Sequence, residues 1–387
     1  MQSTKRPSVA LLTNAPAPYR TPFFNELSKR CRLLVSFNTK LESHREWALD
    51  DREFEFEWVL TRGISISRPR TTPLHFPLDV VSILKRFSPD VVVSSELGAR
   101  TASAAVFCRL QNRPLIVKWE GTPYTDGANS LTTIRRRKLL GYATRVWGNG
   151  KESASSLIAY GVPPSCIDLG MTGTDTDSWR RRVEDARSVM RPDLRNQYGL
   201  EGTVILFVGH LSTLKGIPEL LAALDLLVVE RNLPSWSALF VGSGPLSRDI
   251  EAWSESHPAV PVAVAGFVQP GELAQYYAAS DLMAVPTLTD RWGLVCLDAV
   301  VAGIPQVTSM FAGAAADLVT SGEIGVIVDP RDARSLAKHL ADRIRLGPQR
   351  IPVALRDRAM NDWSTLTMVE RAMSSILSVV QNQLPTP

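Results

Sequence analysis

Residues Thr203 to Leu227 read TVILFVGHLSTLKGIPELLAALDLL and indicate the fold class. The segment begins with an apolar run typical of a buried strand, continues through a loop that contains Gly209 and Gly216, and ends in a helical pattern. A buried strand that leads through a short loop into a helix is the repeating unit of a parallel α/β sheet. This stretch therefore predicts a doubly wound α/β domain.

The same alternation recurs along most of the chain. We expect strands at 8–14, 31–37, 90–95, 114–119 and 144–149, and again at 203–209, 237–245, 260–268, 281–287 and 324–330. The polar segment 180–202 separates the two series, and we interpret it as a linker. For a chain of 387 residues, two Rossmann-like domains are predicted, at 1–183 and 184–362. Ligands of parallel sheets lie outside the carboxyl ends of the strands, so we expect a site in the interdomain cleft.

The composition is that of an ordinary globular protein, with 44% hydrophobic and 21% charged residues. No run reaches the roughly 18 apolar residues of a membrane helix, and the first residues lack a secretory pattern, so we predict a cytoplasmic protein. The four cysteines form no CxxC pair and indicate neither a disulfide framework nor a zinc site. A net charge of +4 does not indicate a nucleic-acid partner.

The basic run RRRK (135–138) has two interpretations. A solvated helix face is the commoner one. Peripheral contact with an anionic membrane surface is the other, and it would suit an enzyme with a lipid-linked substrate.

Two glycine-containing loops follow predicted strands. The loop 209–216 presents backbone N–H groups and the cation of Lys215, which together suit an anion, although a lone lysine is more often solvated. Gly242 and Gly244 in VGSGP permit close approach of a bulky ligand, or serve only a tight turn. Neither a phosphate loop of nucleoside triphosphatases nor a full G-x-G-x-x-G is present.

Two carboxylates stand eight residues apart in TDRWGLVCLDAVVAGIP (289–305). Asp290 precedes or caps a predicted helix and Asp298 lies within it, and eight residues return a helical side chain to about the same face. Ionised carboxylates bind sugar hydroxyls well, and Gly293 between them leaves helix-start amides for a phosphate. For the spacing alone, a capping Asp followed by an unrelated Asp on the helix face is the favoured explanation.

Five motifs in one order resemble the family 4 retaining glycosyltransferases of the GT-B fold. They are GHLSTLKG (209–216), VGSGP (241–245), VAGFV (264–268), the acid pair 290–298 continued by AVVAGIPQV, and GAAADLVTSGEIGVIVDP (313–330). TGTDTDSW (172–179) is similar to the end of the family's first domain, and NDWST (361–365) to the start of its closing helix. The resemblance implies a C-terminal helix, 363–383, that returns to the N-terminal domain. It is dense from about residue 148 onward.

The resemblance also implies residue roles. Lys215 would neutralise the diphosphate of a nucleotide-sugar donor, Asp298 would hold its ribose, and Asp290 would orient the transferred sugar. The remaining donor-binding candidates are Gly209, His210, Gly242, Gly244, Phe267 and Val268 along the base, Trp292, and the helix-start amides of Gly293 and Leu294. No metal is expected, because no D-x-D follows a strand in a position to face the phosphates.

The sequence departs from the family pattern at three donor-side positions and at its N-terminal glycine pair, which is replaced by NAPAPYRTPFF (14–24). Asp290 and Asp298 stand where glutamates are usual, and His210 stands where an arginine is usual. The acceptor side is less defined. Tyr19 and Arg20 follow the first strand and Glu120 and Tyr124 follow another, so we take these four as acceptor-side candidates, with Glu120 as a catalytic candidate for the acceptor proton. A rigid turn with an exposed Arg20 and a salt-bridged or capping Glu120 are the alternatives.

The resulting prediction is a retaining glycosyltransferase of the hexosyltransferase type. It would move a sugar from a nucleoside diphosphate sugar to a hydroxyl of a glycan or a lipid-linked acceptor. Two alternatives stay open: a sugar-nucleotide epimerase or hydrolase on the same fold, and a non-catalytic sugar-nucleotide-binding subunit. The last is motivated by His210 and the two shortened acids.

Overall fold

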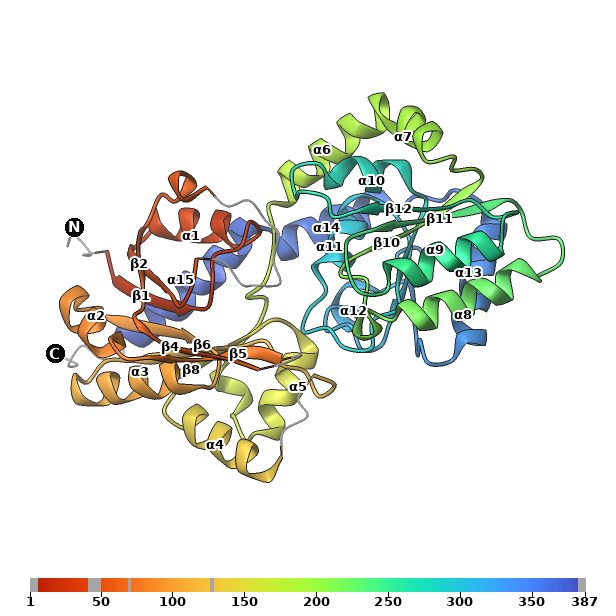
Figure 1. Ribbon diagram of the computed structural model, residues 1–387. Helices are drawn as coiled ribbons and strands as arrows, with labels where there is room; N and C mark the ends of the chain where they lie inside the picture. Colours follow the sequence, from red (N-terminus) through yellow and green to blue (C-terminus); the bar gives the residue numbers. More distant parts are fainter. Residues whose placement is uncertain (1–5, 41–49, 69–70, 126–128, 382–387) are drawn as a thin grey trace. The chain divides into compact units, whose positions relative to one another are not determined.

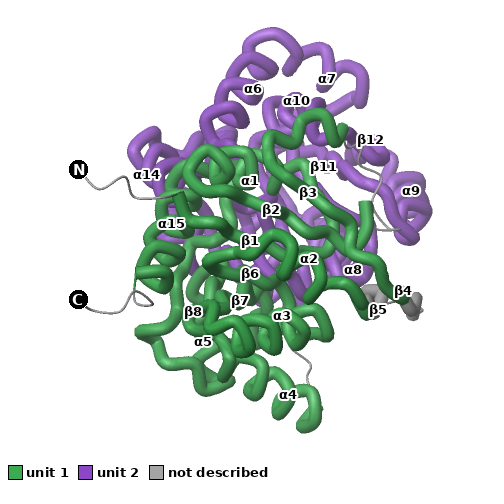
Figure 2. The backbone as a smooth tube through the Cα atoms, turned by 90° about the vertical axis from the view of Figure 1, so that its left-hand side faces the viewer, with its two compact units in different colours: residues 1–174, 365–387 green, residues 175–364 purple. Residues whose placement is uncertain are grey.

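The computed structural model describes residues 6–40, 50–68, 71–125 and 129–381. The chain forms two compact units (Figure 2). The N-terminal unit comprises residues 1–174 and 365–387, and the C-terminal unit comprises residues 175–364. The boundary that we placed after residue 183 falls inside helix α6 (Thr176–Val189), which belongs to the C-terminal unit.

The N-terminal unit is built on a parallel sheet of seven strands among the described residues. In spatial order they are β3 (Glu57–Leu60), β2 (Arg32–Phe37), β1 (Ser8–Thr13), β6 (Val91–Ser95), β7 (Leu115–Trp119), β8 (Arg145–Gly148) and β9 (Ile167–Asp168). The five predicted strands are all present. The short edge strands β3 and β9 were not predicted, because neither has a long apolar run.

Side chains of alternate residues in these strands enter two separate cores, as the pleat requires. Val9 and Leu11 pack with α1 (Thr21–Ser28) and α15 (Thr365–Gln381), whereas Ala10 and Leu12 pack on the other face. That second face is covered by α2 (Val80–Phe87), α3 (Ala99–Leu110), α4 (Ser130–Leu140) and α5 (Lys151–Ala159) (Figure 1). The sheet is therefore buried on both faces.

Helix α15 confirms that the last helix returns to the N-terminal unit. Val369 and Ile376 of α15 are fully buried against β1, β2 and α1. The Trp147 indole N–H in β8 donates to Ser375 Oγ at 2.8 Å. An antiparallel hairpin, β4 (Gly63–Arg68) and β5 (Thr71–Pro77), stands apart from the sheet and was not predicted.

The C-terminal unit repeats the plan with a parallel sheet of six strands among the described residues. In spatial order they are β12 (Val262–Gly266), β11 (Trp236–Val241), β10 (Thr203–Val208), β13 (Leu282–Val285), β14 (Gln306–Ser309) and β15 (Gly325–Val328). One face is covered by α8 (Ile217–Val228), α9 (Ser247–Ser256) and α13 (Ala333–Leu346). The other is covered by α6, α7 (Arg191–Gln197), α10 (Leu273–Ala279), α11 (Leu294–Val301), α12 (Ala315–Leu318) and α14 (Val353–Trp363).

The segment 180–202 is not a linker, because most of it lies in α6 and α7. Apolar residues at helical spacing in this charged stretch, such as Val183 and Leu194, are buried against the sheet. Arg191 and Arg195 form ion pairs with the buried Asp281 at the start of β13. The high charge of the segment therefore reflects an outer helix face and a buried ion-pair network.

Each sheet reverses its strand order once. In the N-terminal unit the chain winds from β1 to β3 and then returns to place β6 beside β1. In the C-terminal unit it winds from β10 to β12 and returns to place β13 beside β10. Parallel sheets bind ligands at the carboxyl ends of the two strands that flank such a switch point. None of the described helices is both long and apolar enough to cross a lipid bilayer.

Candidate functional site

The loops that leave the carboxyl edge of the C-terminal sheet are tied together by backbone hydrogen bonds. The bonds join the loops after β10, β11, β13 and β14: Leu211 N–H to Ser243 O at 2.9 Å, Leu288 N–H to Leu214 O at 3.0 Å, and Asp290 N–H to Phe311 O at 3.2 Å. Because each loop is fixed by its neighbour, side chains carried on different loops hold fixed relative positions.

Lys215 and Asp290 meet at the switch point of this sheet. Lys215 ends the short helical turn η3 (Thr213–Lys215) after β10, Asp290 lies in the loop after β13, and their side chains form an ion pair. The backbone N–H of Trp292 donates to Asp290 Oδ1, the carboxylate oxygen that does not contact Lys215, at 3.3 Å. The side chains are 32% and 20% exposed, so both remain accessible to a ligand.

Glycine at position 216 allows the loop after β10 to lie against the segment that follows β13. Gly216, the capping residue directly before α8, has φ +75°. A Cβ atom added there would lie 1.9 Å from Pro286 O. Cβ atoms at Gly242 and Gly244 would likewise meet backbone, at 1.9 Å from Gly209 O and 2.3 Å from Leu211 O. The glycines thus permit close contact between neighbouring loops, which is a local reason for these motifs besides contact with a ligand.

The N-terminus of α11 is open for hydrogen bonding. Gly293 caps it with φ +88° and without a side-chain cap, so Asp290 is not the capping residue. Among the described residues, the N–H groups of Gly293 and Leu294 make no recorded hydrogen bond. Two free N–H groups and the positive end of the helix dipole favour an anion here, close in sequence to Asp290.

Asp298 lies in the middle of α11, on a part of the helix that packs near α6. The Trp179 indole N–H donates to the Asp298 carbonyl oxygen at 3.0 Å, and Arg182 is the cation that acts on its carboxylate. No hydrogen bond to that carboxylate is recorded within the described ranges. Removal from water raises the pKa of Asp298 to about 7, and the weaker attraction of Arg182 offsets only part of this effect.

The structure does not join the two carboxylates directly. Asp290 is paired with Lys215, whereas Asp298 lies near α6 and Tyr277. Burial in the first place, and then the charge of Asp298, raise the pKa of Tyr277. Both acids nevertheless lie near the buried Cys296, where burial in the first place, and then their charges, raise the pKa of the thiol. They therefore belong to one electrostatic environment.

The remaining donor-side candidates differ in exposure. His210 is exposed in the loop after β10, and Phe267 and Val268 are half-buried directly after β12, at the same edge of the sheet. Trp292 is only 4% exposed and packs against Trp363 with ring centroids 4.5 Å apart. Trp292 therefore supports the start of α11 from the core, and we withdraw it as a residue that contacts the donor.

At the carboxyl edge of the N-terminal sheet, two acceptor-side candidates meet. Arg20 donates to Glu120 Oε1 at 2.9 Å, and Lys118 Nζ lies 3.1 Å from the same oxygen. Glu120 is thus a salt-bridged acid, as one of our two interpretations expected. The Arg20 guanidinium lies 5.4 Å from the centre of the Tyr19 ring, and Tyr124 is exposed in the loop after β7.

Four residues that adjoin this pair were not predicted. Lys118 contacts Glu120, and Arg100, which lies near Arg20, contacts Asn14 and Glu96. Asn14 and Glu96 directly follow β1 and β6, and Lys118 lies near the end of β7. The position of a charged residue at the end of an apolar strand is a signal that would have found Lys118 and Glu96. Arg100 lies within α3, whose sequence resembles that of an ordinary surface helix, so no pattern indicates that Arg100 is buried.

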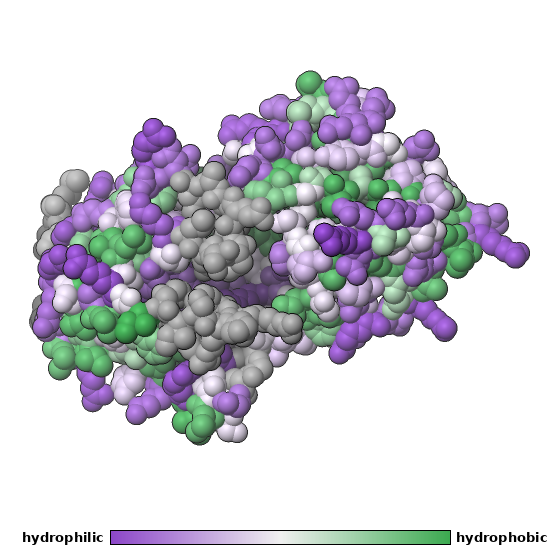
Figure 3. All heavy atoms as spheres, viewed as in Figure 1, coloured by the Kyte–Doolittle hydropathy of each residue, from purple (hydrophilic) through white to green (hydrophobic). Residues whose placement is uncertain are grey.

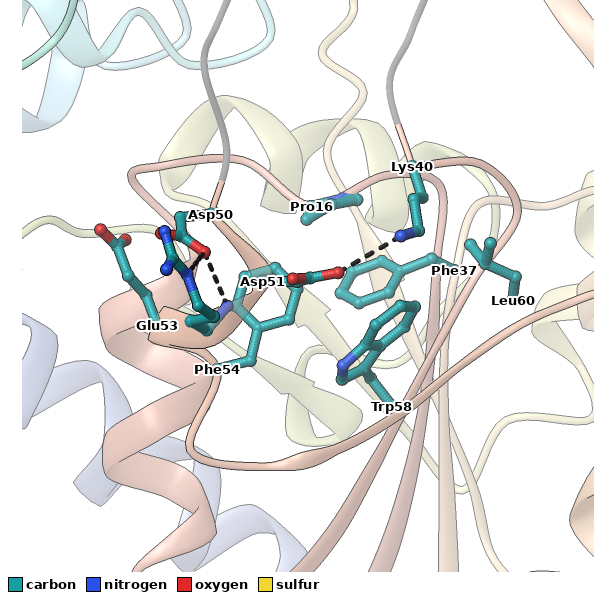
Figure 4. A pocket seen from close by; sticks show the side chains of 10 residues that line it. Pro16, Phe37, Lys40, Asp50, Asp51, Glu53, Phe54, Trp58 and Leu60 are labelled. Atoms are coloured by element: carbon teal, nitrogen blue, oxygen red, sulfur yellow. Dashed lines mark hydrogen bonds and ion pairs between the residues drawn. The ribbon is translucent and has the colours of Figure 1, made fainter.

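A hollow of about 590 Å³ opens beside the ends of β2 and β3. Figure 4 shows Phe37, Phe54 and Trp58 lining it, with Lys40 and Asp51 as an ion pair beside the rings at 3.2 Å. The described part of its wall also includes Pro16, Asp50, Arg52, Glu53 and Leu60. Aromatic rings combined with carboxylates suit a ligand that is rich in hydroxyl groups.

Metal binding is not indicated by the described residues, in which no three His, Cys, Asp or Glu side chains are grouped to hold an ion. That the reaction needs no metal stays a prediction.

Comparison with known proteins identifies the C-terminal unit. Residues 190–354, nearly the whole of that unit, match the protein family described as glycosyl transferases group 1. The C-terminal unit is a group 1 glycosyl transferase domain. The ion pair of Lys215 with Asp290 and the open start of α11 lie within the matched range.

Relatives of this glycosyl transferase domain include a D-inositol 3-phosphate glycosyltransferase of Rhodococcus opacus (strain B4). It is 32% identical over 204 residues, which cover 51% of this chain and 44% of that protein. The sulfoquinovosyl transferase SQD2 of Arabidopsis thaliana is 24% identical over 286 residues, or 67% of this chain and 51% of that protein. The chain thus matches about half the length of these two relatives.

Solved structures resemble this chain over nearly its whole length. The complex of Anabaena Alr3699/HepE with UDP has a TM-score of 0.73 at 17% identity and covers 96% of this chain and 100% of that one. Sucrose-phosphate synthase from Thermosynechococcus elongatus has a TM-score of 0.73 at 17% identity, covering 98% and 100%. With its two Rossmann-like units, the fold is GT-B, as predicted.

Proposed function

We propose that this chain is a retaining glycosyltransferase that takes a hexose-type sugar from a nucleoside diphosphate sugar. The observation that carries the proposal is the ion pair of Lys215 with Asp290 at the switch point of the C-terminal sheet. Support comes from the family of residues 190–354. The solved complexes of Alr3699/HepE with UDP and with UDP-glucose have the same fold.

The proposed chemistry centres on the leaving diphosphate. As the bond between the sugar C1 and the diphosphate oxygen breaks, the oxygen gains negative charge. Lys215 and the free N–H groups of Gly293 and Leu294 would stabilise that charge. Asp290 would release Lys215 to the diphosphate and accept hydrogen bonds from the sugar hydroxyls. The acceptor hydroxyl would then attack from the face that the leaving group departs, and its proton would pass to the departing diphosphate oxygen. Attack on that face retains the anomeric configuration.

Asp298 is the proposed ribose ligand. Its carboxylate makes no recorded hydrogen bond within the described ranges, and its raised pKa reflects a charge that lacks compensation. Two ribose hydroxyls would supply the missing donors and favour the ionised form. Phe267 and Val268, half-buried at the end of β12, would lie along the nucleobase.

The proposed acceptor is a glycan or a lipid-linked sugar. The hollow beside Trp58 and Asp51 carries the mixture of rings and carboxylates that suits a sugar. A lipid-linked acceptor would bring the enzyme to the inner face of the cytoplasmic membrane. That location and the cytoplasmic one stay predictions.

Helix α4 is the proposed surface for such contact. Leu131 and Ile134 are 77% and 63% exposed on it, and Arg135, Arg137 and Lys138 are exposed beside them. Figure 3 shows hydrophobic residues at the surface at the lower end of the molecule, where Figure 1 places α4. Basic and apolar side chains on one exposed helix suit the headgroup region of an anionic membrane.

Product analysis tests the proposed function. The protein would be incubated with UDP-, GDP-, ADP- and dTDP-sugars, with and without a panel of glycan and lipid-linked acceptors, and all sugar products would be identified. We expect one donor to yield a new glycosidic bond that depends on the acceptor. An epimerised or hydrolysed sugar as the main product, or donor binding without turnover on any acceptor, would contradict the proposal and favour one of its two alternatives.

A further inference from the structure

The backbone is strained at Glu96, at the switch point of the N-terminal sheet. Glu96 directly follows β6, one of the two strands that flank the reversal, and has φ +78°. Left-handed backbone is uncommon outside glycine, and asparagine adopts it more readily than glutamate does. The other described non-glycine residues with positive φ, Ser88, Asn112 and Asn232, lie shortly after helices α2, α3 and α8, where such backbone is ordinary. Glu96 differs from them because it follows a strand and carries a long side chain.

Neighbouring groups hold Glu96 in this conformation. Its backbone N–H donates to Lys118 O at 3.4 Å, and its carbonyl oxygen accepts a hydrogen bond from the Thr101 hydroxyl. Thr101 is fully buried, and Ser94 Oγ lies 2.8 Å from the same hydroxyl. Strained residues that their surroundings hold in place are typical of functional sites.

The side chain of Glu96 is anchored at both carboxylate oxygens. The Asn14 side-chain amide donates to Glu96 Oε1, and Arg100 Nη2 lies 3.3 Å from Glu96 Oε2. Asn14 directly follows β1, the other strand at the reversal, and its Oδ1 accepts from the same Arg100 nitrogen at 3.0 Å. Each of the three side chains thus contacts the other two, and the carboxylate has a fixed position.

Arg100 is a costly residue for the fold to retain. It is 2% exposed, and its Nη2 also donates to Ser95 O at 2.8 Å. Its Nε and Nη1 are buried and have no hydrogen-bond partner among the residues that the structure describes. Burial lowers the pKa of Arg100, and Glu96 opposes the change. Because a buried ion pair of this kind is weak evidence for stability, the fixed position of Glu96 better explains the retention of Arg100.

The Glu96 carboxylate has room for a ligand. The side chain is 42% exposed. An ionised carboxylate has about four acceptor positions, whereas one partner is recorded for each oxygen of Glu96 within the described ranges. A carboxylate accepts hydrogen bonds and repels anions, so this position suits a sugar hydroxyl rather than a phosphate.

The hollow lined by Phe37 and Trp58 opens at the same edge of this sheet. β1 alone separates β2, at the hollow, from β6, at Glu96. The N–H of Asn38, directly after β2, donates to Asn14 O at 2.7 Å and so ties the loop after β1 to that strand end. β2 and β6 are two strand spacings apart, about 10 Å, so one short glycan can contact both the hollow and Glu96.

We propose that Glu96 binds the acceptor and that its carboxylate accepts a hydrogen bond from a hydroxyl group of a neutral sugar unit. The inference rests on the proposed function, because it names a residue that recognises the acceptor and the chemical class of the group that it recognises. Asn14 and Arg100 act in it as positioning residues that fix the carboxylate.

Kinetics of sugar transfer test the proposal with the acceptor that product analysis identifies. In Glu96→Gln we expect the acceptor KM to rise about tenfold or more, because a hydrogen bond to a charged group is lost, while the donor KM stays unchanged. Glu57→Gln, which replaces an exposed glutamate at the amino end of β3, is the matched control and should leave both KM values unchanged. Circular dichroism and calorimetric binding of the donor nucleotide would confirm that each variant is folded.

A double-mutant cycle tests the positioning roles. Asn14→Ala alone should raise the acceptor KM, but it should add little in the Glu96→Gln protein, because it acts through the same carboxylate. The same pattern is expected of Arg100→Lys, which retains the buried charge. Equal effects in both backgrounds would show that Asn14 and Arg100 do not act through Glu96.

Two results would overturn the proposal: an acceptor KM that is unchanged in Glu96→Gln, or one that rises equally in Glu57→Gln. If the wild type transfers no sugar, the proposed function fails, and saturation-transfer NMR with glucose, galactose and mannose tests Glu96 by itself. Loss of the sugar signal in Glu96→Gln with its retention in Glu57→Gln then keeps Glu96 as a sugar-binding residue. Any other NMR result overturns the inference as well.

Discussion

Lys215 and Asp290 form an ion pair although 75 residues separate them in the sequence. The pair depends on two loops that are held together by the Leu288–Leu214 hydrogen bond and by the close contact at Gly216. A partly exposed lysine and aspartate contribute little stability on their own. An ion pair held in place at a switch point is therefore better explained by ligand binding than by a contribution to the stability of the fold.

Substitution of Asp290 should separate affinity from turnover. In Asp290→Asn, Lys215 loses its partner, so we expect a nucleoside diphosphate without sugar to bind more tightly, by about 1 kcal/mol. Sugar transfer should fall at the same time, because Asp290 no longer orients the sugar. Calorimetry and a transfer assay on one preparation check this. Weaker diphosphate binding in Asp290→Asn would show that Asp290 does not restrain Lys215.

Gly216 should be far less tolerant of alanine than another glycine with positive φ. Gly199 has φ +62° and open space where a Cβ atom would lie, so Gly199→Ala should cost about 1–2 kcal/mol of backbone strain alone. Gly216→Ala adds a clash with Pro286 O and should cost about 1–3 kcal/mol more. Urea unfolding of both variants provides the comparison. Equal midpoints would mean that the two loops separate without penalty.

Asp298 should make the stability of the protein depend on pH. An unfolded aspartate has a pKa near 3.9, whereas burial raises the pKa of Asp298 to about 7. The folded state thus retains a proton that the unfolded state has lost. Stability from this group is complete below about pH 4 and is lost as the pH rises to about 7, on the order of 2 kcal/mol after allowance for partial solvent access.

Asp298→Asn removes this titration. We expect the variant to gain stability relative to the wild type as the pH rises from 5 to 8, measured as the difference between urea midpoints at each pH. The exposed Asp342→Asn is the matched control and should follow the wild type. Parallel profiles for wild type and Asp298→Asn would contradict the burial argument.

Helix α4 should bind anionic vesicles at low salt. The double variant Leu131→Ser with Ile134→Ser should reduce the bound fraction about tenfold or more, because each apolar side chain contributes about 1.5–3 kcal/mol when fully buried. Val106→Ser with Leu110→Ser removes two exposed apolar side chains from α3 and serves as the control. Vesicle sedimentation provides the measurement. Equal loss in both double variants would remove α4 as the contact surface.

Much of the fold was predictable because the central strands of both sheets are buried on both faces and therefore read as apolar runs, as at 91–95 and 203–208. The edge strands and the β4–β5 hairpin lack such runs. Segment 180–202 was misinterpreted because its charged outer face conceals buried positions such as Val183 and Leu194.

The candidate site was predictable in part for the same reason. Lys215 and Asp290 each follow a recognisable strand, so their meeting follows from the topology. The cluster around Arg100 was missed because it forms only when three strand ends converge, and a single arginine within a helix gives no sign of its burial. Trp292 was predicted to contact the donor because it lies between the two acids in the sequence. Its burial against Trp363 could not be foreseen, because Trp363 belongs to α14, which is distant in sequence.

The most direct test of the central claim is calorimetric titration with UDP, GDP, ADP and dTDP of the wild type, Lys215→Ala and Lys338→Ala. Lys338 is the control for Lys215: it also forms an ion pair, with Asp342 at 3.1 Å, but it is exposed on α13 and does not lie at a strand end. We expect at least one nucleotide to bind, Lys215→Ala to weaken its binding by roughly 1–3 kcal/mol, and Lys338→Ala to leave it unchanged. No binding to the wild type, or equal affinity in the wild type and Lys215→Ala, would contradict that claim.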